Sequence, residues 1–127
     1  MILGRFGEIG ELLFDIDLIG ANEEILPVEA LLDTGFTTVW LALDLQDAEA
    51  LGWTLIERRR VMQTAQGETF FALYQGRVII GEEEFTIPVH ARVGVQEILL
   101  GLQWLRMQRL VVDFPQGLLT LEMSPLS

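Results

Sequence analysis

The sequence predicts a mostly β fold, either a closed β-barrel or a folded antiparallel sheet, with one or two short helices. Three observations predict it: apolar and polar residues alternate along most of the chain, the alternating segments are short, and Gly, Pro, Asn and Asp residues separate them. Many short strands in a small chain are typical of a barrel or a sandwich. A length of 127 residues suits one hydrophobic core, so we expect a single domain that spans residues 1–127.

The first clear strand shows the pattern by which the others are recognised. Leu12, Phe14 and Ile16 recur at every second position and therefore share one face. By the same pattern, the expected strands cover residues 11–19, 25–32, 39–43, 55–64, 69–80, 85–93, 98–101, 109–114 and 118–123. The fourth and fifth of these form a long hairpin around residues 65–68, and Gly76 is expected to mark a bulge or bend.

Two segments have helical character. Residues 44–52 begin with Asp44 as an N-cap, continue with acidic residues and end at Gly52 as a stop. Residues 102–107 are long enough for a helical turn or two.

Charge and composition exclude several partners. Nineteen acidic residues against eight basic ones give a formal charge of −11, which repels phosphate backbones, so we expect no nucleic-acid partner. No uncharged apolar run approaches the ~18 residues that a membrane-spanning helix needs, so we expect no membrane association. The first residues lack the pattern of a signal peptide, and a cytoplasmic location is the expectation.

Few side chains remain for catalysis, because the chain has one histidine and no cysteine. His90 falls in the middle of the expected strand 85–93, on a polar face that should meet water. The only serines, Ser124 and Ser127, lie at the end of the chain, so a Ser-His-Asp triad is not expected. A single histidine with acids on separate turns offers no convergent ligand set, and we expect no metal and no cofactor.

Asp33-Thr34-Gly35 stands in a chemically specific context. The apolar strand 25–32 delivers the Asp33 carboxylate onto a tight turn, and a hydroxyl and a glycine follow it. Backbone N–H groups of such a turn can hold a buried carboxylate. An ordinary Asp-x-Gly turn after a strand is the alternative, because the tripeptide alone is only suggestive.

A second element lies about 65 residues further on, where Leu99-Leu100-Gly101 precedes the short helical segment. Together with Asp33-Thr34-Gly35, it resembles the retropepsin-like (retroviral-type) aspartic proteases, and in particular their small bacterial branch. The resemblance covers nearly the whole chain. In that family an Asp-Thr-Gly loop, a β-hairpin flap, a hydrophobic-hydrophobic-Gly strand and a short helix follow one another in this order.

The resemblance implies an aspartic endopeptidase that acts as a homodimer on a peptide or protein substrate. Each subunit would contribute Asp33, and two close carboxylates would share one proton and activate a water as general base and general acid. Thr34 would hydrogen-bond to the partner's loop, and Gly35 would leave its backbone free to approach the carboxylate and the substrate.

The same resemblance implies the remaining site residues. Leu99, Leu100 and Gly101 would support the catalytic loop from below. Substrate binding would fall to Phe36 and to the flap residues Ala65, Gln66 and Gly67. Phe36 departs from the alanine that many retropepsins have after Asp-Thr-Gly, and its ring is expected to alter the shape of a subsite.

The dimer contact is expected at the catalytic loop, the flap tips and the chain termini, where residues 118–123 offer a pairing strand. Phe70, Phe71 and Leu73 are interpreted mainly as core residues. Two other functions stay open: a dimerisation or peptide-binding module that keeps the fold without turnover, and a plain β-barrel with an accidental tripeptide.

Overall fold

The computed structural model describes residues 1–64 and 67–123, which form eleven strands, one α-helix and one 3₁₀-helix. The bounds are β1 (Ile2–Leu3), β2 (Arg5–Phe6), β3 (Leu12–Ile19), β4 (Ile25–Leu32), β5 (Leu41–Asp44), α1 (Leu45–Ala50), β6 (Thr54–Thr64), β7 (Gly67–Ile80), β8 (Glu83–Arg92), β9 (Ile98–Leu100), η1 (Leu102–Arg106), β10 (Gln108–Asp113) and β11 (Leu118–Met123).

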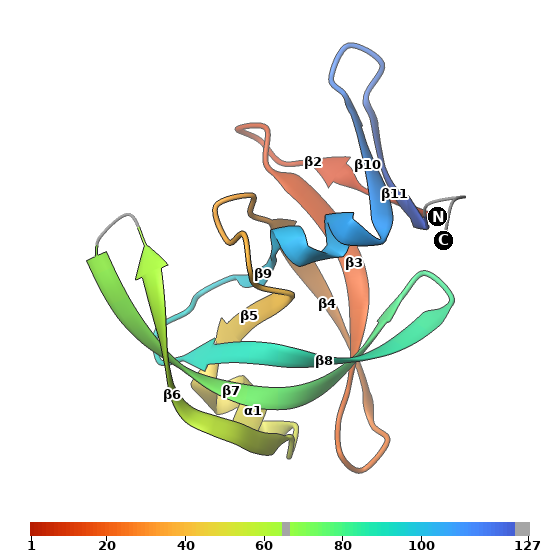
Figure 1. The fold of residues 1–127 in the computed structure, drawn as a ribbon. Helices are drawn as coiled ribbons and strands as arrows, with labels where there is room; N and C mark the ends of the chain where they lie inside the picture. Colours follow the sequence, from red (N-terminus) through yellow and green to blue (C-terminus); the bar gives the residue numbers. More distant parts are fainter. Residues whose placement is uncertain (65–66, 124–127) are drawn as a thin grey trace.

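Six of these strands close into a barrel, which confirms the predicted fold class. In the order β3, β4, β9, β5, β8 and β7 each strand pairs with the next, and β7 pairs back with β3. The pairs β4–β9 and β5–β8 are parallel, and the other pairs in this ring are antiparallel. As Figure 1 shows, β6 and β7 run out from the barrel as a long hairpin.

A second, three-stranded sheet has the order β1-β11-β10 and brings the start and the end of the chain together. In Figure 1 the start of the chain lies beside β11, away from the β6–β7 hairpin. The first residues of the chain are therefore held in pairs with β11 and, through β2, with β3.

The core fills the barrel, and Trp104 is the largest of its fully buried side chains. Its ring lies edge-on to Trp40 and Phe85, with centroids 4.8 and 5.0 Å away, and such pairs add about 1 kcal/mol each beyond their buried area. The indole Nε1–H donates to the Trp40 carbonyl at 2.7 Å, so the one polar atom of this side chain is satisfied. Short helix η1 is thus anchored to the loop before β5.

The helix predicted over 44–52 is confirmed as α1. Asp44 is its N-cap: one carboxylate oxygen accepts from Gln46 N–H at 3.0 Å, and the other accepts from Gly94 N–H at 2.9 Å. Gly52 follows the helix with a φ of +72°, the left-handed conformation that favours glycine. Within the described residues, no helix is long and apolar enough to span a membrane.

Two local predictions are corrected: the bulge expected as one option at Gly76, and the exposure of His90 to water. Gly76 marks no bulge, since it pairs in register with Ile87. An added Cβ there would lie 2.5 Å from Val89 Cγ2, so packing requires the glycine. The irregular register lies instead in β6 around Glu57. His90 does not face water, because it is only 5% exposed and its ring meets that of Phe71 at 5.8 Å.

Candidate active site

Asp33 directly follows β4 and begins the loop of residues 33–40 that leads to β5. Its backbone N–H donates to Leu100 O, and its Oδ1 accepts from Gly35 N–H, both at 2.8 Å. A Cβ on Gly35 would come within 3.1 Å of that same Oδ1, so the glycine lets the turn close on the carboxylate. The half-buried Asp33 side chain is therefore fixed by backbone groups at the end of a strand.

Strand β9 lies between β4 and β5, and the loop 33–40 is hydrogen-bonded to its end and to the start of η1. Leu99 and Leu100 pair with both neighbouring strands. An added Cβ on Gly101 would lie 1.9 Å from Val39 O, so only glycine fits at this close approach. Three backbone bonds follow: Gly101 N–H to Trp40 O (3.0 Å), Leu102 N–H to Phe36 O (2.9 Å) and Gln103 N–H to Val39 O (3.3 Å).

A pocket of about 660 Å³ opens between this loop and the β6–β7 hairpin. Its volume lies in the range usual for ligand sites. Its lining comes from the loop, the hairpin and the end of β8, and consists of Asp33, Gly35, Phe36, Thr37, Thr38, Val61, Met62, Gln63, Thr69, Phe71 and Arg92. Within this lining Asp33 is the one acidic residue and Arg92 the one basic residue. The carboxylate thus faces a largely uncharged hollow of suitable size for part of a peptide.

The structure places some of the predicted site residues in the lining of the pocket and others outside it. Asp33, Gly35 and Phe36 line the pocket. Thr34 is exposed on the same loop and is not part of the lining. The three residues of the second motif lie in β9 and just after it, below the loop.

The predicted flap residues lie at the turn of the β6–β7 hairpin. Gly67 opens β7, pairs with Thr64 and has a φ of +105°, which favours glycine at this turn. Ala65 and Gln66 lie outside the described residues.

Phe71 and Arg92 belong to the pocket, although the sequence pattern did not assign them to it. Phe71 is buried as expected of a core residue, but it also forms a wall of the pocket. Its ring meets Phe36 edge-on, with centroids 6.3 Å apart. Phe70 is instead exposed on the other face of β7, where the Arg59 guanidinium lies 3.7 Å from its ring centroid. Alternation along β7 predicts which of its residues share a face. It does not predict that the face with Phe71 lies over the loop of residues 33–40.

The ring of Phe71 also meets the buried ring of His90, with centroids 5.8 Å apart. Burial, together with the smaller effect of the positive charge of Arg60, lowers the pKa of His90 to about 4, while the negative charge of Glu57 opposes the shift. Its Nδ1 has no hydrogen-bond partner among the described residues. A neutral imidazole is therefore packed under the wall of the pocket at neutral pH. Elsewhere in the described chain, no group of three or more His, Asp or Glu side chains is arranged to hold a metal ion.

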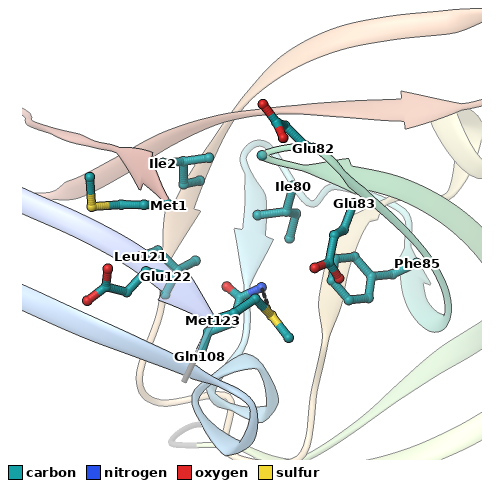
Figure 2. A pocket seen from close by; sticks show the side chains of 11 residues that line it. Met1, Ile2, Ile80, Glu82, Glu83, Phe85, Gln108, Leu121, Glu122 and Met123 are labelled. Carbon is teal, nitrogen blue, oxygen red and sulfur yellow. Dashed lines mark hydrogen bonds between the residues drawn. The ribbon is translucent and has the colours of Figure 1, made fainter. Parts of the chain in front are cut away.

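A second hollow of about 300 Å³ lies between the three-stranded sheet and the turn that joins β7 to β8 (Figure 2). Gln108 sits at its base and donates through Nε2 to Met123 Sδ at 3.7 Å. The two hollows share no lining residue.

Strand β11, proposed above as the pairing strand of a dimer, is already paired on both sides. β10 covers its whole length on one side, and β1 covers Thr120 and Leu121 on the other. A partner chain could therefore pair with β11 only where β1 leaves it open.

No family model matches this chain, and no curated protein matches it. Among solved structures, the chain is similar to a retropepsin-like aspartic protease from Rickettsia conorii. The two are 24% identical with a TM-score of 0.66, over 96% of this chain and 89% of that one. This chain has the retropepsin-like fold. A likeness at this level of identity establishes the fold, while activity must be tested on the site itself.

We expect Gly101→Ala to lower the free energy of unfolding by at least about 2 kcal/mol, because the methyl group would overlap the Val39 carbonyl. The control is Gly117→Ala, where φ is +64° and no atom lies within 4 Å of an added Cβ. Left-handed strain alone should cost the control about 1 kcal/mol. Urea unfolding of both variants measures the difference, and equal losses would contradict the close approach.

We expect the wild-type chain to lose stability as the pH falls through the window between about 6.5 and 4. The unfolded histidine binds its proton near pH 6.5, whereas folded His90 binds it at about 4, so acid favours the unfolded state. Between pH 7 and pH 5 this contribution amounts to about 2 kcal/mol. Urea unfolding of wild type and His90→Leu at both pH values, at one protein concentration, should show the extra loss only in wild type. A parallel loss in both would assign the pH dependence elsewhere.

Proposed function

We propose that this chain is one subunit of a homodimeric aspartic endopeptidase in which two Asp33 carboxylates activate a water to hydrolyse a peptide bond. The observation that carries the proposal is the placement of Asp33. It is held by Gly35 N–H and by the bond to Leu100, and it lines the pocket beneath the β6–β7 hairpin. The retropepsin-like fold supports the same reading.

The pocket of a single chain is chemically incomplete for this reaction. Its described lining contains one carboxylate and no histidine, so it lacks a second group to act as acid while Asp33 acts as base. A two-fold axis beside the exposed Thr34 would bring a second Asp33 next to the first. Thr34 is free on the loop surface for a hydrogen bond to the partner's loop, a role that fits its exposure.

In the dimer the two carboxylates would share one proton, because two negative charges about 3 Å apart repel strongly. The ionised member accepts a proton from the water between them while the protonated member donates to the carbonyl oxygen of the substrate. The water oxygen attacks the carbonyl carbon, and the amine leaves after the proton is passed to its nitrogen. The hairpin would close over an extended peptide and exclude bulk water.

We expect purified wild-type protein to cleave a mixed library of unfolded peptides between about pH 4.5 and 7. The rate should rise faster than linearly with protein concentration, and Asp33→Asn should reduce it at least about 1,000-fold. Asp47→Asn, on the exposed face of α1, is the matched control and should keep full activity. All assays are done above pH 4.3, because at pH 4.3 itself the chain has no net charge and tends to precipitate.

Mass spectrometry of the products measures cleavage, and sedimentation measures the assembly state of the same samples. A folded dimer that cleaves nothing at any of these pH values would contradict the proposal. It would favour instead a peptide-binding module that retains the fold without turnover.

A further inference from the structure

Among the described residues that line the pocket, Arg92 carries the one positive charge and Asp33 the one negative charge. Arg92 ends β8. In the antiparallel pair of β7 and β8, Ala72 is the partner of Ala91, so Phe71 and Arg92 come next and lie opposite each other. The two side chains therefore share one face of the sheet. Both side chains line the pocket. The exposed side chain of Arg92 therefore lies at one wall of the proposed substrate site, on the strand next to that of Phe71.

Among residues 1–64 and 67–123, Arg92 forms no ion pair, side-chain hydrogen bond or aromatic contact. All eight basic residues of the chain are arginines. Six of them have partners: Arg5 with Asp15 and Glu29, Arg59 with Phe70, Arg60 with Glu57, Arg77 with Glu23 and Glu84, Arg106 with Gln103, and Arg109 with Glu122. The other arginine without a recorded partner, Arg58, is exposed on β6 and does not line the pocket.

The nearest acidic residue in register does not neutralise Arg92. Asp44 is its partner across β5 and β8, but both oxygens of that carboxylate accept backbone N–H groups, from Gln46 and Gly94. The backbone of Arg92 is held in the barrel by the same pairing. A cation on a fixed strand, with its neighbouring acid engaged elsewhere, is available to an external anion.

We propose that Arg92 is a specificity-determining residue that selects peptide substrates with a carboxylate within a few residues of the hydrolysed bond. This inference rests on the proposed function and names a substrate class for it. A guanidinium binds a carboxylate through two parallel hydrogen bonds, a geometry that an amide cannot match. The carboxylate is either an Asp or Glu side chain or the C-terminus of the peptide, because both present the same group.

The overall charge of the chain predicts the opposite preference, for basic peptides, so the two explanations can be distinguished by experiment. At −11 the protein field attracts basic peptides and repels acidic ones. A preference for an acidic residue must therefore come from a short-range contact, and Arg92 is the cation of the described pocket that supplies it.

The experiment starts from a peptide that wild type cleaves, blocked at both ends and resynthesised with Glu or Gln at each position flanking the cleaved bond. A third set has Gln at these positions and a free C-terminal carboxylate at varied distance from the bond. The proteins are wild type, Arg92→Gln and the matched surface control Arg58→Gln. Values of kcat/KM are compared within each protein, so that a loss of folding or of general activity cancels in the ratio.

At the best position we expect wild type and Arg58→Gln to favour the carboxylate peptide over its Gln counterpart about tenfold. Arg92→Gln should reduce this ratio to about one, and Arg92→Glu should favour a Lys peptide instead. Preference for the Glu set identifies a side chain as the ligand, whereas preference for the third set identifies the peptide terminus. Either result supports the inference.

A wild-type ratio near one at every position, with cleavage intact, would overturn the role of Arg92 and leave the proposed protease standing. If nothing is cleaved, fluorescence anisotropy with labelled members of the Glu and Gln sets decides. Suppose that binding prefers the Glu peptides, is lost in Arg92→Gln and is kept in Arg58→Gln. That result would contradict the proposed protease activity and support carboxylate recognition by Arg92. Equal binding of both sets would overturn the two together.

Discussion

The end of β9 fixes the loop of residues 33–40, and the candidate site depends on this contact. Backbone bonds join the loop to residues 100–103 at both of its ends, and Gly101 approaches Val39 O so closely that no side chain fits. Trp104 then ties the same loop to the core through its indole N–H. The Asp33 carboxylate is therefore positioned by the barrel itself, before any substrate or partner is present. Preorganised groups of this kind are what catalysis requires of a scaffold.

A second constraint follows from the proposed function, in which one chain offers half of the reaction site. The described lining of the pocket has one acidic and one basic residue, and the proposals give them different roles: Asp33 takes part in the chemistry, and Arg92 recognises the substrate. Thr34 lies exposed where a two-fold partner would approach. A net charge of −11 acts on a substrate over long range and carries no sequence information, so the proposed selection must arise from short-range contacts inside the pocket.

Much of the barrel was predictable because alternation reveals which residues of a strand share a face. It does not reveal the partner strand, so neither the β3–β7 closure nor the place of Phe71 over the loop could be derived from it. The position of Asp33 at a strand end was predictable from the apolar run before it. The burial of His90 was not, because Phe71 covers it from a different strand. Gly76 is explained by Val89 on the neighbouring strand, a contact that is absent from the local sequence.

The central claim, that two Asp33 residues from different chains form one reaction site, is tested most directly with mixed subunits. Wild-type and Asp33→Asn chains are unfolded together in known ratios, refolded to allow random pairing, and assayed at a fixed total concentration. Because a mixed pair holds only one carboxylate, activity should fall with the square of the wild-type fraction, so that an equal mixture retains about a quarter of full activity. A linear fall, with about half retained, would show that each chain acts alone and would contradict the account.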